Sequence, residues 1–590
     1  MGGRPKKNVG AIVGKNGVSF RVWAPFASSV AVTGSFNNWG ETPLKGERGG
    51  YWYTLVREAK AGQEYKFVIR NGDSTYYRND PRALHFTTSA GNSVIASPGF
   101  DWGDDDFKPP PLEEQVIYEL HVGTFNRPDM AFNGTFADVI DKLDYLVDLG
   151  INMIELMPIS SMLMDRGWGY AIDYIFAVES LYGGRHAFLK FVKAAHARGI
   201  GVILDVVYNH FGPDNSLDLW QFDGWHKNNM GGIYFYNDWR AETPWGNTRP
   251  DFGREEVRQY IFDNVWMWVN DCRVDGLRVD STIFMRNVKG FNDDPADDLA
   301  EGWQLMQGIN AVAKKANPAV ITIAEDIGGN EYIVKDSGVG GAGFMTQWEV
   351  GLPHALRDAL WSSDPASINL SGILSELSKR YNGNAFSRVV YSDSHDAAAN
   401  GSARLNEIVS PGKADNLLAR KQSLIAAAII MTMPGVPMLF QGQEFVQGGS
   451  FTDWEGLDWH KAEKYAGIVQ AHKHLVALRR NLAGVSAGLS GSEVNLMHLD
   501  ENNKVISYHR WKNGGPKDDV VVVINFGNRA FENYALSLPR DGLWQVRFNS
   551  AWKGYSPDFK EVEIANVVAE TGTGIINLPA SSVVILSQDN

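Results

Sequence analysis

The chain has 590 residues, too many for a single hydrophobic core, and 44% of them are hydrophobic, as in ordinary globular proteins. Its net charge of −14 and the lack of a sustained Lys/Arg stripe argue against a nucleic-acid partner. The single cysteine, Cys272, excludes an internal disulfide and a multi-cysteine zinc site. No secretory signal is recognisable, and the apolar run 424–431 is far too short to cross a bilayer, so we expect a cytoplasmic protein with no membrane contact.

The first hundred residues read as short strands in which apolar and polar residues alternate, separated by turn residues at regular intervals. This pattern is typical of a small β-sandwich, and we place the first domain at residues 1–105. The acidic and proline-rich stretch 101–111 predicts a linker. The expected strands are Val18–Trp23, Val30–Thr33, Tyr51–Leu55 and Glu64–Ile69.

Beyond the linker, apolar strands alternate with helical stretches such as 188–198, 254–270 and 301–316. Eight such units predict a (β/α)8 TIM barrel over residues 106–485. A doubly wound open sheet is the alternative, but no glycine-rich phosphate turn follows the first strand. The expected strands are Val116–Leu120, Asn152–Leu156, Gly201–Val206, Gly276–Asp280, Val320–Ala324, Gly343–Thr346, Ser387–Tyr391 and Pro437–Phe440.

Two further regions complete the expected architecture. A long irregular insertion, about 208–253, is rich in aromatic residues, and on a barrel it would overhang the C-terminal face where substrates bind. Residues 486–590 return to strand pattern and predict a second, C-terminal β-sandwich. Its expected strands are Val505–Trp511, Val520–Phe526, Trp544–Phe548 and Ser582–Leu586.

The segment Asp275–Asp280 is central to the chemistry that we expect. Strand alternation places Arg278 and Asp280 on one face, and a neighbouring guanidinium lowers the pKa of a carboxyl group and keeps it ionised. Three other expected strand ends also carry polar groups: Asp205–His210, Glu325–Asp326 and Ser392–Asp396. We therefore expect the carboxylates Asp280, Glu325 and Asp396 to converge at the barrel mouth, with Arg278, His210 and His395 as donors around them.

Other roles would also suit some of these groups. Three acids with histidines would suit a divalent ion only if Arg278 pointed elsewhere, so we expect neither a metal nor a cofactor. His121 could contact substrate or be a hydrogen-bonded core group. Glu444 and Asp173 could belong to the rim of the site or only solvate it.

The strand-end motifs resemble those of the α-amylase superfamily, glycoside hydrolase family 13. Phe20–Pro25 and Gly34–Trp39 resemble the carbohydrate-binding module of branching enzymes and isoamylases. The resemblance implies that Asp280 is the nucleophile, Glu325 the general acid/base and Asp396 a third carboxylate that binds sugar hydroxyls. It further implies substrate-binding roles for Tyr170 with Trp168 before it, His210, Arg278, His395 and, as a support of Arg278, Asp205.

Retaining glycoside chemistry requires one ionised and one protonated carboxyl group about 5–5.5 Å apart. We expect like charges from Asp280 and Asp396 to raise the pKa of Glu325, as a proton donor needs. The covalent intermediate on Asp280 would then be released by a hydroxyl group that Glu325 deprotonates.

The sequence leaves open whether that hydroxyl belongs to a sugar or to water. Residues 322–329 and 392–396 are similar to motifs of 1,4-α-glucan branching enzymes, which predicts cleavage of glycogen, amylose or maltooligosaccharides and transfer to a 6-hydroxyl. Residues 205–213 and 243–246 equally resemble maltooligosyl-trehalose trehalohydrolase, so an α-glucan hydrolase, of that kind or amylase-like, is the alternative. The stretch 397–401 departs from branching enzymes. A non-catalytic glucan-binding protein is disfavoured because all three carboxylates are present.

Overall fold

The computed structural model describes residues 9–164, 166–213, 216–291, 294–362, 364–559 and 564–590. Backbone contacts divide the chain into two compact units. The first comprises Met1–Pro109, His121–Asp141 and Glu155–Met345, and the second comprises Pro110–Leu120, Lys142–Ile154 and Thr346–Asn590.

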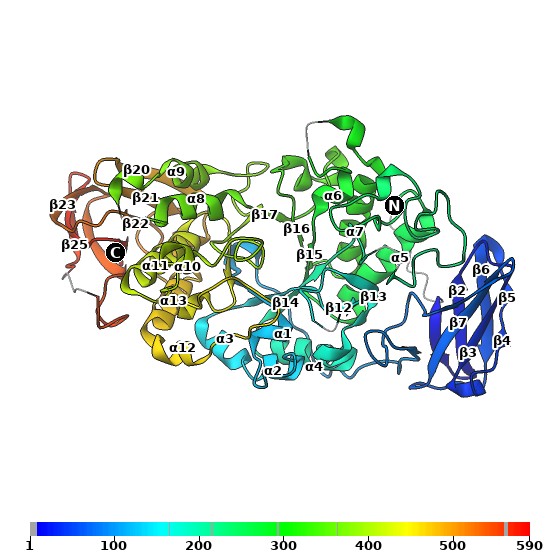
Figure 1. The fold of residues 1–590 in the computed structure, drawn as a ribbon. Helices are drawn as coiled ribbons and strands as arrows, with labels where there is room; N and C mark the ends of the chain where they lie inside the picture. The colour runs from blue at the N-terminus through cyan, green and yellow to red at the C-terminus, as the bar shows by residue number, and fades with distance from the viewer. Residues whose placement is uncertain (1–8, 165, 214–215, 292–293, 363, 560–563) are drawn as a thin grey trace. The chain divides into compact units, whose positions relative to one another are not determined.

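Eight short strands close into a parallel barrel, as the alternation of strands and helices predicted. Figure 1 labels β14, β15, β16 and β17 among them. In order around the barrel they are β10 (Ile117–Leu120), β11 (Met153–Leu156), β14 (Gly201–Val206), β15 (Gly276–Val279), β16 (Ile321–Ala324), β17 (Thr346–Trp348), β18 (Arg388–Val390) and β19 (Val436–Phe440).

The expected position of the sixth strand, Gly343–Thr346, is wrong by about three residues. The backbone N–H groups of Ala342 and Gly343 donate to the carbonyl groups of Tyr332 and Lys335, and Gly343 has a φ of +87°, far from the extended region of a regular strand. The apolar residues before Thr346 therefore belong to a loop, and β17 begins after them.

The helices of the first unit bury one apolar side. In α4 (Gly184–His196), Phe188, Phe191, Val192 and Ala195 recur at helical spacing and are all buried. The expected helices 254–270 and 301–316 correspond to α5 with the π-helix that continues it and to α7. The bounds are α1 (Val122–Phe125), α2 (Phe136–Ile140), α5 (Glu255–Trp266), η7 (Met267–Asp271), α6 (Thr282–Arg286) and α7 (Ala300–Ala316).

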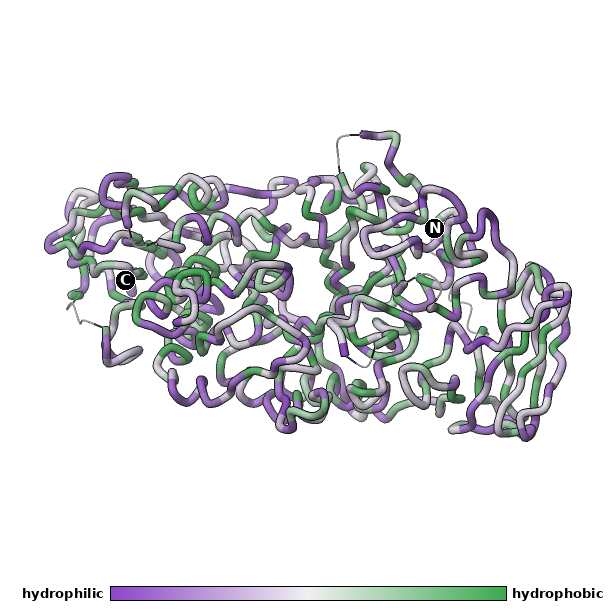
Figure 2. The backbone as a smooth tube through the Cα atoms, viewed as in Figure 1, coloured by the Kyte–Doolittle hydropathy of each residue, from purple (hydrophilic) through white to green (hydrophobic). Residues whose placement is uncertain are grey.

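The N-terminal part folds into two antiparallel sheets with a shared core. Along β2 (Gly17–Trp23), Val18, Phe20 and Val22 are buried and alternate with less buried residues. Figure 2 shows the resulting alternation of hydrophobic and hydrophilic positions in these strands. One sheet has the order β1-β2-β6-β5 and the other β4-β3-β7-β8, with β9 on β7. The bounds are β1 (Gly10–Gly14), β3 (Ser29–Gly34), β4 (Thr42–Pro43), β5 (Lys45–Gly46), β6 (Tyr51–Val56), β7 (Glu64–Asn71), β8 (Ser74–Arg78) and β9 (Ser93–Val94).

Within the first unit, the N-terminal sandwich holds the long insertion that follows β14. The Arg78 guanidinium donates to the three consecutive carbonyl groups of residues 220–222, at 3.0–3.2 Å. The Phe26 ring stacks on Trp225, with 4.6 Å between centroids. These contacts satisfy backbone acceptors that an isolated loop would leave to water.

The second unit contains the remaining helices and the C-terminal strands. Helix α11 (Leu417–Thr432) is buried on nearly all sides, which explains the uninterrupted apolar run 424–431. The other helices are α3 (Leu143–Leu149), α8 (Gly351–Leu360), α9 (Ser371–Ser378), α10 (Leu405–Val409), α12 (His460–Lys464) and α13 (Ala466–Arg479). No helix in the described part of the chain is both long and apolar enough to cross a membrane.

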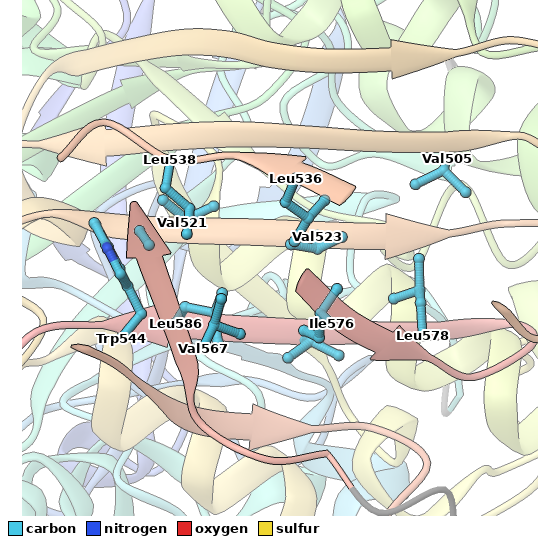
Figure 3. Packing of buried hydrophobic residues seen from close by; sticks show 12 residues of the cluster. Val505, Val521, Val523, Leu536, Leu538, Trp544, Val567, Ile576, Leu578 and Leu586 are labelled. Atoms are coloured by element: carbon cyan, nitrogen blue, oxygen red, sulfur yellow. The ribbon is translucent and has the colours of Figure 1, made fainter. Parts of the chain in front are cut away.

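The C-terminal strands follow the order β20-β21-β22-β27-β24-β25-β26-β23 and fold over one apolar core. Leu536 and Ile576 from one end of this path pack with Val521, Val523 and Leu586 from the other, as Figure 3 shows. The bounds are β20 (Glu493–Asp500), β21 (Val505–Trp511), β22 (Val520–Asn525), β23 (Phe531–Ser537), β24 (Gly542–Asn549), β25 (Val567–Glu570), β26 (Thr573–Leu578) and β27 (Ser582–Ser587).

Candidate active site

A single arginine joins the ends of three neighbouring barrel strands. Arg278, on β15, is fully buried, and its Nη1 donates to Asp280 Oδ1 and to Asp205 Oδ2, both at 2.7 Å. Its Nη2 lies 3.0 Å from Glu325 Oε2, at the end of β16. The pairing of Arg278 with Asp280 is the one that strand alternation predicts, whereas the contact with Glu325 was not expected from the sequence.

The charges in this cluster do not balance. Burial alone would lower the pKa of Arg278, but the carboxylates of Asp205, Glu325 and Asp280 outweigh it and raise the pKa well above its ordinary value. The guanidinium is therefore a permanent cation surrounded by three acidic groups. Such an excess of negative charge in a buried site stabilises a positive charge that develops on a bound molecule.

Asp280 is held at both of its carboxylate oxygens. While Arg278 binds Oδ1, the side-chain amide of Asn209 donates to Oδ2 at 2.7 Å and to the Asp280 carbonyl at 2.9 Å. Asn209 was not singled out by the sequence analysis, although it stands between Asp205 and His210 in the third-strand motif. It fixes the orientation of the carboxylate.

His210 is a neutral donor or acceptor that contacts Asn209. Its Nδ1 lies 2.5 Å from Asn209 Oδ1, and the ring is almost completely buried. Burial lowers the pKa of His210 to about 3, so the imidazole carries no charge at neutral pH. It can therefore bind a sugar hydroxyl without adding a second cation to the cluster.

The turn after Asp280 is fixed directly onto Glu325. The Ser281 N–H donates to Glu325 Oε2 at 2.8 Å, and Thr282 donates to the Glu325 carbonyl through both its N–H and its hydroxyl. Ser281 has a φ of +40°, which is costly for a residue with a side chain. Backbone strain of this kind occurs where neighbouring contacts hold a functional geometry.

Tyr170 reaches the cluster through Asp205. Its hydroxyl donates to Asp205 Oδ2 at 2.7 Å, and this half-buried residue belongs to the segment that connects β12 (Ser160–Met162) to β13 (Ile172–Val178). The preceding Gly169 has a φ of +97°, and a Cβ there would lie 2.3 Å from the Pro158 carbonyl oxygen, so only glycine fits. Trp168, on the other side of this glycine, is half-buried.

The motif at the end of the seventh barrel strand, Ser392–Asp396, lies in the second unit, and its side chains have partners there. His395 Nδ1 lies 2.5 Å from Glu119 Oε1, and the His395 N–H donates to Glu119 Oε2 at 3.2 Å. His395 Nε2 lies 3.3 Å from Asp396 Oδ2, and Asn400 donates to Asp396 Oδ1 at 3.2 Å. The Asp396 side chain is 44% exposed and His395 only 2%, so Asp396 is the group that a ligand can reach.

Glu119, on β10, was missed by the sequence analysis. A buried glutamate in the short apolar strand Ile117–Leu120 was the available signal, because a carboxylate is rarely buried without a partner. Its partner, His395, could not be identified from sequence alone.

The structure thus brings together Asp205, Arg278, Asp280 and Glu325 directly, with His210 joined through Asn209 and Tyr170 through Asp205. Asp396 and His395 belong to the second unit. The convergence of Asp396 with the other two carboxylates, and the separate roles of all these residues, remain predictions.

Three further polar residues are core groups rather than rim groups. Both ring nitrogens of His121 have protein partners, with Nδ1 3.1 Å from Thr124 Oγ1 and Nε2 2.9 Å from the Tyr182 hydroxyl. Glu444 and Asp173, which could have belonged to the rim or solvated it, are both buried. Burial raises the pKa of each. Among the described residues, no group of three or more His, Cys, Asp and Glu side chains is arranged to hold a metal ion.

Three family models match the chain in succession. Carbohydrate-binding module 48 (isoamylase N-terminal domain) matches residues 7–83, the α-amylase catalytic domain matches residues 117–506, and the α-amylase C-terminal all-beta domain matches residues 496–589. The chain therefore belongs to the α-amylase family, glycoside hydrolase family 13.

Within this family, the chain is similar to branching enzymes from two organisms. A 1,4-alpha-glucan branching enzyme GlgB of Corynebacterium jeikeium is 30% identical over 574 residues, covering 92% of this chain and 77% of the relative. A protein of the same name from Mycobacterium bovis is 30% identical over 581 residues, covering 93% and 76%.

Solved structures support the fold. A putative alpha amylase from Salmonella typhimurium superimposes with a TM-score of 0.73 at 21% identity, covering 99% of this chain and all of the other. Pullulanase from Paenibacillus barengoltzii gives a TM-score of 0.78 at 20% identity, covering 100% of this chain and 95% of the other.

Proposed function

We propose that the chain is a 1,4-α-glucan branching enzyme. The observation that carries its glycoside chemistry is the cluster in which Arg278 holds Asp205, Asp280 and Glu325 together at three strand ends. Similarity to branching enzymes over more than nine-tenths of the chain supports the same reaction.

In the first half of the reaction, Asp280 attacks the anomeric carbon of an α-1,4-linked glucosyl unit while Glu325 protonates the departing 4-oxygen. Arg278 and Asn209 keep the Asp280 carboxylate oriented for this attack. The excess negative charge around Arg278 stabilises the oxocarbenium-like transition state. The products are a glycosyl ester on Asp280 and a shortened glucan chain.

In the second half, Glu325 removes a proton from the 6-hydroxyl of a glucan, and that oxygen attacks the anomeric carbon and releases Asp280. Asp396 and His395 would bind sugar hydroxyl groups, with Glu119 holding the His395 ring. The net result is one α-1,4 bond exchanged for one α-1,6 bond.

Incubation of the protein with amylose tests this proposal. Proton NMR should show new α-1,6 signals, while an assay of reducing ends should show no increase, because transfer to a 6-hydroxyl leaves no anomeric carbon free. Reducing ends that rise without α-1,6 signals would contradict branching and establish a hydrolase.

Hydrolysis is the second candidate because of the residues after Asp396. The sequence 397–401 departs from branching enzymes, and Asn400 from this stretch donates to Asp396 itself. If the hydrolase outcome is found, maltooligosyl-trehalose is the next substrate to test, since residues 243–246 resemble the trehalohydrolase motif.

The remaining expectations belong to the same proposal. The chain would act in the cytoplasm on neutral α-glucans without a cofactor. Its parts would be an N-terminal module at 1–105, a catalytic barrel at 106–485 and a C-terminal domain at 486–590.

A further inference from the structure

An aromatic residue of the insertion lies directly on the candidate active site. The Trp245 ring stacks on the His210 imidazole, with 4.2 Å between centroids and an interplanar angle of 18°. Trp245 also meets the Phe284 ring edge to face, at 5.3 Å and 75°. Phe284 lies on α6, which begins immediately after the Asp280–Ser281 turn, so Trp245 contacts residues that follow two different barrel strands.

The turn that carries Trp245 is closed by its own hydrogen bonds. Thr243 and Gly246 exchange backbone hydrogen bonds at 2.9 and 3.2 Å, and the Thr243 hydroxyl donates to the Gly246 carbonyl at 2.8 Å. The Trp245 N–H donates to the same hydroxyl at 3.2 Å. The indole is therefore held in place before any ligand arrives, which reduces the entropy lost on binding.

The two stacked rings differ in how much of their surface is exposed to solvent. His210 is only 2% exposed, whereas Trp245 is 44% exposed. Trp245 therefore shields the imidazole and still offers a large aromatic surface outside the cluster. Because burial keeps His210 neutral, the contact between them is a stack of two uncharged rings.

We propose that Trp245 both positions His210 and forms a platform for a glucosyl unit next to the one held by the carboxylates. This inference rests on the proposed glucan substrate. The apolar C–H face of a hexopyranose ring covers exposed indole surface favourably, and an indole loses little conformational freedom when it is covered.

Two substitutions of similar size test the proposal. Trp245→Phe keeps a flat ring, and Trp245→Leu keeps apolar volume without one. For Trp245→Leu we expect the KM for amylose to rise about 10-fold and kcat to fall about 10-fold, because both the platform and the support of His210 are lost. Trp245→Phe should stay within about 3-fold of wild type in both constants.

A control comes from the same insertion. Trp239 is 56% exposed and lies on the short helix η6 (Trp239–Ala241). Trp239→Leu should leave the kcat unchanged, which would show that the loss in Trp245→Leu depends on position and not on the removal of any exposed indole. Thermal unfolding of all variants checks that each is folded.

A measurement of glucan binding distinguishes two outcomes: an error in this inference and an error in the proposed function. Calorimetric titration with maltoheptaose is made in the inactive Glu325→Gln background, with and without Trp245→Leu. An active wild-type chain whose Trp245→Leu variant binds and reacts like Trp245→Phe would overturn the inference alone. A wild-type chain that neither binds nor converts any glucan would overturn the proposed function.

Discussion

Two buried arginines only eight residues apart differ in how their charge is balanced. Arg278 contacts three carboxylates, so its surroundings are negative overall. Within the described part of the chain, the ion-pair partner of Arg286 is Asp326, bound through Nε at 2.8 Å and Nη2 at 2.9 Å, which is a neutral bidentate pair. Because Glu325 and Asp326 are adjacent in sequence, β16 delivers one carboxylate to each arginine. The balanced pair serves the fold, and the unbalanced cluster holds charge that a substrate can use.

The largest expected effect is on activity and comes from the unbalanced cluster. Asp280→Asn and Glu325→Gln should each lower kcat on amylose by at least about 10³-fold, because the nucleophile or the proton donor is lost. Arg278 keeps two acidic partners in either variant, so the melting temperature should stay equal to or above that of wild type. The measurements are the NMR assay and calorimetric unfolding. Near-native turnover in either variant would mean that the residue has another role.

The balanced pair should show the opposite result. Arg286→Met leaves Asp326 buried without its guanidinium and should lower the free energy of unfolding by about 3–5 kcal/mol. The double variant Arg286→Met/Asp326→Leu removes both charges and should recover most of that loss. Urea unfolding of the wild type and the two variants gives the three free energies of unfolding to compare. If the double variant is no more stable than Arg286→Met, the pair is not a closed structural unit.

Glu444 is a third kind of buried acidic group. Among the described residues, no arginine donates a hydrogen bond to its carboxyl group. The hydroxyls of Tyr118 and Tyr145 donate to its Oε1 at 3.0 and 2.9 Å, and burial raises its pKa to about 7. The pKa of the folded state exceeds that of the unfolded state. Its contribution to stability is therefore fully present below about pH 4.5 and is lost as the pH rises through 7.

The free energy of unfolding of the wild type should therefore fall by about 2 kcal/mol more between pH 5 and 8 than that of Glu444→Gln. Glutamine keeps the oxygen that accepts both tyrosine hydroxyls, so it is a matched variant. Parallel stability–pH curves for the two proteins would show that Glu444 does not titrate in this range.

Local patterns predicted the barrel strands and the groups at their ends, because strand alternation and terminal motifs act within a few residues. The sixth strand was misplaced because long-range hydrogen bonds, not composition, decide where β17 begins. Partners such as Glu119 and His395 are 276 positions apart, and Asn209 and Asp280 are 71 apart. No spacing rule connects residues at such separations, so only the closed fold reveals them.

Hydrogen-bond donors of the N-terminal sandwich match acceptors of the insertion. Arg78 supplies the donors for three consecutive carbonyl groups, and the Phe26 and Asn79 N–H groups bind the carboxylates of Asp223 and Asp218. A chimera that takes the insertion from one relative and the sandwich from another would bring acceptors to a surface without the corresponding donors. Recombination within this family should therefore succeed when the two segments are exchanged together, even though about 140 residues separate them in the chain.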